Sequence, residues 1–394
     1  MSWHREKIDQ AKALVAQSGI DVWLTFVRES AGSGDPLLPL LVDGGFTWQT
    51  ALLITRDGRA IAVLGNYDAD PLVASGDWDA VVPYIQGIRE PLLEVLDDVC
   101  GPEPRIAVNT SLHDDKADGI THGMYRALEG MFEGTRFEGV LESAENLARA
   151  LRGRKSGEEA ARMREALRET DLLFAEIAAF AKVGVSERAV YDHVHRLAAE
   201  RGLGFSWDPA GDPIVNSGPH SMVGHGIPSE TIVLEPGHIF HVDLGIVKNM
   251  YSSDIQRCWY VSGGEPVPDD VVHAQAAVLA AIDAGFNALK PGVAGWEVDA
   301  AARAALVAAG YEEYLHALGH QVGLVAHDGG GVLAPRWERY GQTPFHPVEE
   351  SQVYTLELGV TVPGRGYLGL EEMVVVTPSG CEYLSEPQRT MPVL

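Results

Sequence analysis

Four carboxylates and one imidazole in the C-terminal half of the chain are candidate metal ligands. Asp243 lies in HVDLG and Asp254 lies eleven positions later in SSDIQR, and His320, Glu357 and Glu371 follow in apolar, strand-like segments. A buried carboxylate without a partner is costly, and a bound cation removes that cost by neutralising the charge. Mostly oxygen ligands with one nitrogen suit a pair of hard or borderline divalent metals. These residues therefore predict a binuclear metal site and a hydrolase.

The two aspartates are predicted to lie on neighbouring strands. Residues 238–261 have the pattern of two strands joined by a turn around Lys248 and Asn249. In such a hairpin Asp243 and Asp254 lie roughly opposite one another, with Cβ atoms about 4.5–5.5 Å apart. Two carboxylates at that distance repel each other unless a cation lies between them. A pair of solvated aspartates at a strand edge is the alternative.

Three histidines fall within one twelve-residue segment, at His316, His320 and His327. A lone histidine would have a structural explanation. Three in one segment, with glycines at positions 319 and 323 that permit close approach of the backbone, favour a site. Only one of the three need be a ligand.

The two candidate glutamates interrupt apolar runs of the β type, where a lone glutamate would ordinarily be a charge on an edge strand. Glu357 lies in VYTLELGV and Glu371 in YLGLEEMVVVT. Glu371 and Glu372 are adjacent, so their side chains face opposite sides of a strand. Only one of this pair can reach a metal.

The first part of the chain is predicted to form a separate α/β domain without a reactive cluster. A helix ends near Gly19, a strand follows, and Asp57-Gly58 has the composition of a hairpin turn. The composition then changes in the basic stretch 151–157, where Ser156 and Glu159 have the spacing of a capping box. We therefore expect an N-terminal domain at 1–152 and a C-terminal domain at 153–394.

The C-terminal part carries an internal repeat. The sequence KVGVS at 182–186 matches KPGVA at 290–294, an offset of 108, and Gly202 and Gly310 match at the same offset. Each copy has the pattern of a helix, a tight glycine turn, a second helix and then strands. The pattern predicts two related α+β halves about a pseudo-twofold axis, and chance matching is the alternative.

Composition and charge disfavour several classes of partner. The 394 residues carry a net charge of −26, so nucleic acid and anionic membranes are poor partners. The acidity favours solubility, and a field that gathers cations is the alternative. Cys100, Cys258 and Cys381 form no disulfide framework or CxxC pair. Since the sequence has neither a signal peptide pattern nor an apolar run of bilayer length, we expect a cytoplasmic protein.

The segment from about Lys155 to the C-terminus resembles the pita-bread metallopeptidases, specifically the Xaa-Pro branch of prolidase and aminopeptidase P. The resemblance rests on the ordered set of five candidate ligands, on the HxxxHxxGLxxHD string at 316–328 and on KSxxE at Lys155. It implies an α+β fold, with a pseudo-twofold pita-bread catalytic domain after a smaller α/β creatinase-like domain. It also implies a homodimer.

The resemblance implies a role for each ligand. Asp243 would chelate one metal, Asp254 and Glu371 would bridge both, and His320 and Glu357 would complete the other. Ligation dominated by carboxylates favours two Mn²⁺ ions, with Zn²⁺ and Co²⁺ as alternatives.

The resemblance also implies catalytic residues beyond the metal ligands. Glu357 would accept the proton of the attacking water and relay it toward the leaving nitrogen. His225 would line the substrate pocket, and His316 and His327 would contact the substrate or assist proton transfer. The substrate would be a small peptide with proline at its second position.

The chain departs from the family pattern in ways that leave the substrate open. Gly369 stands where the family usually has an arginine associated with substrate binding or the metal shell, and residues 329–347 are longer than expected. We expect an Xaa-Pro dipeptidase, with an aminopeptidase P acting on longer peptides as the close alternative. A creatinase-like amidinohydrolase and a catalytically silent pita-bread binding module are the other readings, and retention of all five ligands argues against both.

Overall fold

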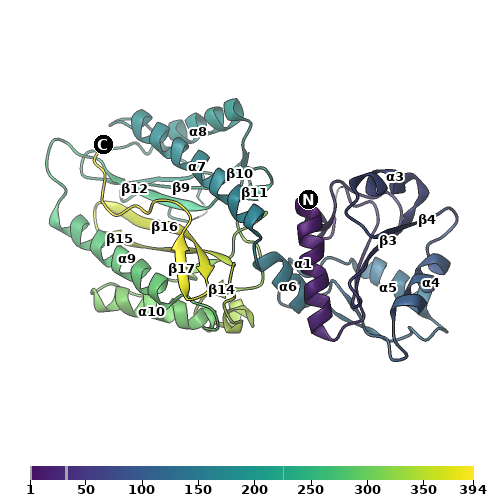
Figure 1. The fold of residues 1–394 in the computed structure, drawn as a ribbon. Coiled ribbons are helices and arrows are strands. Elements are labelled where there is room, and N and C mark those ends of the chain that lie inside the picture. The colour runs from purple at the N-terminus through teal and green to yellow at the C-terminus, as the bar shows by residue number, and fades with distance from the viewer. Residues whose placement is uncertain (1, 32–33, 225) are drawn as a thin grey trace. The chain divides into compact units, whose positions relative to one another are not determined.

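The chain forms two compact units, Met1–Arg152 and Gly153–Leu394, each with its own hydrophobic core. The computed structural model describes residues 2–31, 34–224 and 226–394 (Figure 1). Sheets and helices are mixed in both units, and the α+β class expected from the sequence is confirmed.

The N-terminal unit is built on a six-stranded sheet. Its elements are α1 (Trp3–Ser18), β1 (Val22–Val27), α2 (Leu38–Leu41), β2 (Thr50–Thr55), β3 (Ala60–Gly65), α3 (Asn66–Ser75), β4 (Ala80–Tyr84), α4 (Arg89–Val99), β5 (Ile106–Val108), α5 (His122–Phe132), β6 (Leu141–Ser143) and α6 (Glu145–Gly153). The strand order is β4-β3-β2-β1-β5-β6. The predicted hairpin is confirmed, because β2 and β3 pair antiparallel and Gly58 adopts a φ of 86° in the turn.

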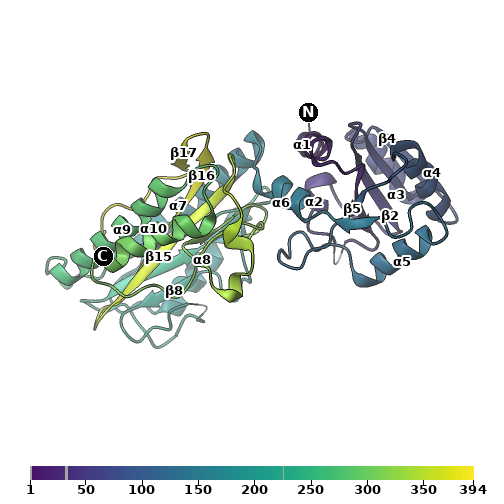
Figure 2. The same cartoon turned by 90° about the horizontal axis from the view of Figure 1, so that it is seen from below.

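The second unit contains the candidate site. Its elements are α7 (Gly157–Phe180), α8 (Glu187–Arg201), β7 (Gly204–Phe205), β8 (Ile214–Ser217), β9 (Ile239–Leu244), β10 (Ile246–Lys248), β11 (Tyr251–Ser252), β12 (Ile255–Tyr260), α9 (Asp269–Ala288), α10 (Gly295–Ala308), β13 (Gly319–His320), β14 (Val332–Leu333), β15 (Val353–Val362), β16 (Gly366–Thr377) and β17 (Gly380–Tyr383). The main sheet has the order β15-β16-β12-β9-β8, and β17 pairs with β16. Figures 1 and 2 show the α9–α10 pair running beside β15.

The two helix pairs repeat one local structure, as the offset of 108 residues predicts. Gly184 and Gly292 both adopt a φ of 88° in the turns that precede α8 and α10. The amide of Gly184 donates to the Leu234 carbonyl over 2.8 Å, and the amide of Gly292 donates to the Val348 carbonyl over 2.9 Å. Glycine is needed at both turns because an L side chain is strained at that φ.

The start of α7 has the predicted cap. The Ser156 hydroxyl accepts from the Glu159 amide, and the Glu159 carboxylate accepts from the Ser156 amide over 2.7 Å. This capping box pairs two backbone donors that the first helical turn leaves free.

The helices and the candidate ligands use opposite faces of the main sheet. On β15, Leu356, Leu358 and Val360 belong to the core that includes α9, and Glu357 alternates with them. Phe174 of α7 lies with its ring centroid 6.0 Å from that of Trp259 on β12. Because side chains alternate along a strand, the residues between these core positions face away from the helices.

One helix, α9, is long and apolar enough to cross a membrane, although we expected no such segment from the sequence. By length and composition α9 is apolar enough to cross a membrane, with a mean hydropathy of 1.2 in its best window. Its buried residues, among them Val271, Val278 and Ile282, are part of the core of the second unit. A core helix of a globular unit passes the same test.

Residues 329–347, the segment that is longer than expected, contain β14 and two short 3-10 helices, Glu338–Tyr340 and Thr343–Phe345. The segment packs against α10, and Pro347 forms a β-bridge with Ala294.

Candidate metal centre

Three of the candidate ligands stand in one row across the main sheet. Gln256 on β12 pairs with Asp243 on β9 and with Glu371 on β16, and Glu371 pairs with Glu357 on β15. Residues directly opposite on neighbouring strands point to the same face and lie close together. The sheet therefore gathers Asp243, Glu371 and Glu357 from strands that are far apart in the sequence.

The expected pairing of the two aspartates is wrong by two residues. The direct partner of Asp243 is Gln256, and the turn is centred on Asn249 and Met250, which adopt φ values of 50° and 72°. Asp254 lies two positions before Gln256, immediately before β12 begins. Asp243 and Asp254 are thus diagonal neighbours rather than opposite partners.

His320 completes the cluster from β13, outside the main sheet. Its Nε2 atom lies 3.7 Å from Oδ2 of Asp254 and 3.5 Å from Oε1 of Glu357. Ligand atoms of Asp254, His320 and Glu371 all lie within 4.8 Å of one another. Four carboxylates and one imidazole from five segments of the chain therefore converge, as the residue types suggest.

The environment of the cluster disfavours free charges. Burial raises the pKa of Asp243 to about 7, and burial followed by the charge of Asp243 raises the pKa of Glu357 to about 8. The pKa values of Asp254 and Glu371 lie well above their usual range, first because of burial and then because of the neighbouring carboxylates. A divalent cation would reverse this preference, since opposite charge favours the ionised form.

The imidazole in the cluster is neutral at physiological pH. Burial, with a smaller contribution from His327, lowers the pKa of His320 to about 3. Neutral imidazole is the form that binds metals.

Two oxygen atoms of the cluster lack a protein partner. Oδ1 of Asp243 and Oε1 of Glu371 are buried and accept no hydrogen bond from any residue that the structure describes. Buried polar atoms normally have a partner, so such orphans call for an explanation. Two oxygens free for coordination, in an oxygen-rich set with one imidazole, fit a divalent cation.

Gln256 is a residue of this cluster that sequence reasoning missed. Its Nε2 atom donates to Oε2 of Glu371 over 3.0 Å and to Oε2 of Glu357 over 3.2 Å. Its Oε1 atom lies 3.0 Å from Nε2 of His241, and Nδ1 of His241 lies 3.1 Å from Oδ1 of Asn216. A neutral glutamine in a strand carries no signal of its own, and only the register of β12 with β16 reveals its position.

The other predicted histidines have different surroundings. The ring of His327 meets the ring of His320 edge to face, with centroids 4.2 Å apart, so His327 lies beside the cluster. His316 is held in its own turn, where Nδ1 lies 2.7 Å from the Ala317 carbonyl and Arg303 donates to its carbonyl. His225 lies outside the described residues.

The adjacent glutamates separate as predicted. Glu371 belongs to the carboxylate row, whereas Glu372 is buried on the opposite face and accepts from Arg257 over 3.0 Å. Arg257 also donates to the Glu371 carbonyl. The ion pair therefore fixes the backbone at the residue that carries a candidate ligand.

Two arginines that could stand in for the family's arginine at position 369, Arg365 and Arg336, have other partners. Arg365 pairs with Asp270 over 2.6 Å, and the guanidinium of Arg336 lies 4.4 Å from the ring centroid of Trp296. A Cβ atom placed on Gly369 would meet Cε1 of Tyr367 at 2.4 Å. The space beside Gly369 is thus filled by a tyrosine ring.

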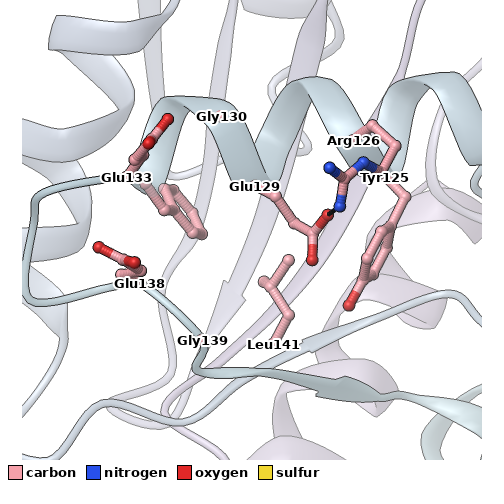
Figure 3. Close-up of a pocket in the computed structure, with 9 residues that line it drawn as sticks. Tyr125, Arg126, Glu129, Gly130, Glu133, Glu138, Gly139 and Leu141 are labelled. Carbon is pink, nitrogen blue, oxygen red and sulfur yellow. Dashed lines mark hydrogen bonds and ion pairs between the residues drawn. The ribbon is translucent and has the colours of Figure 1, made fainter.

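A pocket in the N-terminal unit has no part in this cluster (Figure 3). It encloses about 530 Å³ between α5 and the segment that leads to β6, and Glu129, Glu133 and Glu138 line it together with Arg126. Arg126 pairs with Glu129, and Glu138 accepts from the Gly134 amide. The convergent ligand-type residues lie in the other unit, so this pocket is not the candidate site.

Known proteins are similar to this chain in sequence. A sequence profile of metallopeptidase family M24 matches residues 161–378. The uncharacterized peptidase YqhT of Bacillus subtilis is 30% identical over 278 residues, which are 70% of this chain and 73% of that protein. The Xaa-Pro dipeptidase of Pyrococcus furiosus is 32% identical over 209 residues, 53% of this chain and 56% of that protein.

Solved structures resemble the whole chain. The dipeptidase PepE from Mycobacterium ulcerans superposes with a TM-score of 0.74 at 25% identity, covering 99% of this chain and 98% of that one. The Xaa-Pro dipeptidase from Bacillus anthracis gives a TM-score of 0.73 at 26% identity and covers 99% and 100%. The resemblance inferred from the ordered ligands is confirmed, and the chain belongs to metallopeptidase family M24, as a peptidase with the pita-bread fold.

Proposed function

We propose that this chain is a dinuclear metal-dependent peptidase that cleaves Xaa-Pro bonds, with a preference for dipeptides. The observation that carries the proposal is the convergence of Asp254, His320 and Glu371, with Glu357 and Asp243 in the same row of the sheet. The Xaa-Pro dipeptidases among the similar proteins support the choice of substrate.

Two divalent ions, Mn²⁺ by preference and Zn²⁺ or Co²⁺ as alternatives, would be held by Asp243, Asp254, His320, Glu357 and Glu371. When bound, the ions supply charge that lowers the pKa of water and polarises the scissile carbonyl. The orphaned oxygens of Asp243 and Glu371 support this ligand set.

The protein residues would handle the proton and orient the peptide. Glu357 keeps one fifth of its side chain exposed, so it can reach both water and substrate. It would accept a proton from the attacking water and pass it to the leaving nitrogen of proline. His327, beside His320, would donate to the oxygen that becomes negative during attack, and we assign His225 and His316 to substrate contact.

Proline provides the basis for selection. Its nitrogen has no N–H and its ring fixes φ, so a site shaped for that ring discriminates against other residues. We also propose that the protein is a cytoplasmic homodimer that binds neither nucleic acid nor membranes, in keeping with its net charge of −26.

One observation favours an aminopeptidase P acting on longer peptides as the second candidate. A dipeptide places its carboxylate directly after proline and therefore needs a cationic partner. The side chains around Gly369 are His241, Gln256 and Tyr367, and burial lowers the pKa of His241 to about 4, so none of the three carries a charge at neutral pH.

A peptide-library digest tests the proposal. The protein, purified without chelator, is incubated with Mn²⁺, Zn²⁺ or Co²⁺, and products are identified by mass spectrometry, with an Ala-Pro dipeptide and an Ala-Pro-Ala tripeptide in parallel. We expect cleavage before proline and faster turnover of the dipeptide. Cleavage of the tripeptide alone would establish the second candidate. A protein that binds no divalent ion and cleaves nothing would be a binding module.

A further inference from the structure

Tyr367 lies on the same face of the main sheet as the carboxylates. On β16, Tyr367, Gly369 and Glu371 are separated by steps of two residues, and they pair with Thr361, Gly359 and Glu357 on β15. Residues two apart on a strand share a face. The sheet therefore places a tyrosine, then a pair of glycines, then the candidate ligands in successive rows.

The two glycines make room for the tyrosine ring. A Cβ atom on Gly369 would stand 2.4 Å from Cε1 of Tyr367, and one on Gly359 would stand 2.4 Å from both Cζ and the hydroxyl oxygen of Tyr367. No side chain tolerates such distances. The ring thus covers the glycine row, with its hydroxyl end over Gly359, two residues along the strand from Glu357.

A chain of buried polar residues holds the ring in this position. The imidazole of His241 meets the ring of Tyr367 edge to face, at 89° and with centroids 5.1 Å apart. His241 is fixed in turn between Asn216 and Gln256, over 3.1 Å and 3.0 Å. The orientation of Tyr367 is therefore coupled to Gln256, the residue that holds Glu357 and Glu371.

The ring also borders the part of this face that solvent reaches. Asp243, Glu357, Gly359 and Tyr367 are half-buried, whereas Gly369 and its neighbours toward the core are buried. Burial, followed by the charge of Glu357, raises the pKa of Tyr367, so its hydroxyl keeps its proton at neutral pH. A protonated phenol beside accessible ligands can donate to a bound peptide.

We propose that Tyr367 contacts the peptide substrate and determines which residues the site accepts, an assignment that rests on the proposed peptidase function. The flat face of its ring bounds the space beside Glu357 and limits the size of the side chain accepted there. Its hydroxyl donates a hydrogen bond to a polar atom of the peptide. The alternative is a ring that only fills space over Gly359 and Gly369.

Two substitutions distinguish a ring that contacts the substrate from a ring that only fills space. Tyr367→Phe keeps the ring and removes only the hydroxyl, and Tyr367→Ala removes the ring. The matched control is Tyr311→Phe, since the Tyr311 ring stacks on His273 of α9 and packs against the apolar core. Each Mn²⁺-loaded variant is tested on a series of Xaa-Pro peptides in which Xaa increases in size from Gly to Phe. The kinetic constants kcat and KM are measured separately, and melting temperatures verify folding.

We expect Tyr367→Phe to raise KM about three- to tenfold with little change in kcat, as for a neutral hydrogen bond made equally in the ground and transition states. Tyr367→Ala should shift the ratio of kcat/KM for large and small Xaa by about tenfold or more toward the large residue. Tyr311→Phe should leave both quantities unchanged. Identical KM values and size profiles in the two Tyr367 variants and the wild type would overturn the proposal.

A failure of the proposed peptidase function can be distinguished from a failure of the role assigned to Tyr367. If the wild type cleaves peptides of another class, the same variants are compared on the best substrate from the peptide library. If Tyr367→Ala does not fold, Tyr367→Phe alone decides, because it removes only the hydroxyl oxygen and keeps the ring.

Discussion

The side-chain amide nitrogen of Gln256, Nε2, donates to Oε2 of Glu371 over 3.0 Å, where β12 pairs with β16. This bond, with the second one to Glu357, leaves Oε1 of Glu371 as the oxygen without a protein partner. A neutral donor therefore orients the two glutamates without competing for the charge that they offer to a cation. Groups that orient metal ligands in this way commonly tune metal affinity.

Gln256→Met should weaken binding of Mn²⁺ by about 10- to 100-fold, because the replacement keeps the volume but cannot donate to the glutamates. Isothermal titration of the metal-free protein measures the dissociation constant directly. The surface variant Gln342→Met provides the control, since Gln342 is exposed. An unchanged dissociation constant for Gln256→Met would mean that the two glutamates are oriented by the sheet alone.

Asp254→Asn should abolish turnover while the fold remains intact, because the substitution preserves shape and removes one candidate ligand charge. Asp254 lies 3.7 Å from the His320 nitrogen and in the cluster with Glu371. Peptide hydrolysis and metal content are measured on the same preparation, with the exposed Asp115→Asn as the control. A variant that keeps full activity would show that Asp254 is not a required metal ligand.

The stability of the metal-free protein should fall as pH rises from about 4 toward 8. The folded-state pKa values of Asp243 and Glu357 are raised to about 7 and about 8, so in this range the folded state binds more protons than the unfolded state. Each such group contributes a slope of up to about −1.4 kcal/mol per pH unit to the free energy of unfolding. Urea unfolding in EDTA at several pH values measures this slope.

Saturating Mn²⁺ should remove or invert that slope, since the ions replace protons on the carboxylates and bind more tightly as pH rises. Asp243→Asn should flatten the slope in EDTA because one of the titrating groups is gone. A metal-free protein that becomes more stable between pH 5 and pH 8 would contradict the raised pKa values.

Local sequence patterns predicted the parts of the fold that depend on neighbours in the chain. The cap at Ser156 and the hairpin turn at Gly58 follow from side chains and backbone angles within a few residues. The separation of Glu371 from Glu372 follows from the alternation of a strand. The five candidate ligands follow from the sequence because carboxylates and a histidine are conspicuous in apolar, strand-like segments.

The remaining features depend on the register in which strands pair. The aspartate register was wrong because the turn is centred on Asn249 and Met250 rather than on Lys248 and Asn249. Gln256 and Tyr367 gave no signal, because Gln256 bonds to Glu371 and Tyr367 packs against His241, partners that are far away in the sequence. Register between segments more than a hundred residues apart is a tertiary property, and no local periodicity encodes it.

The buried ion pair on the face opposite the carboxylate row should stabilise the fold only while both partners are present. Removing one partner should be costly, and replacing both with apolar residues should be tolerated. Arg257 donates to both oxygens of Glu372, over 3.0 Å and 3.1 Å, and both residues are buried. Arg257→Met should lower the free energy of unfolding by about 3–5 kcal/mol, because it leaves a buried carboxylate without its cation, and adding Glu372→Leu should restore most of the loss. Arg188→Met is the matched control, since the Arg188–Asp192 pair is 43% and 58% exposed and should contribute at most about 1 kcal/mol. Urea unfolding of the four proteins tests this, and a double variant no more stable than Arg257→Met would show that the pair stabilises the sheet by more than mutual neutralisation.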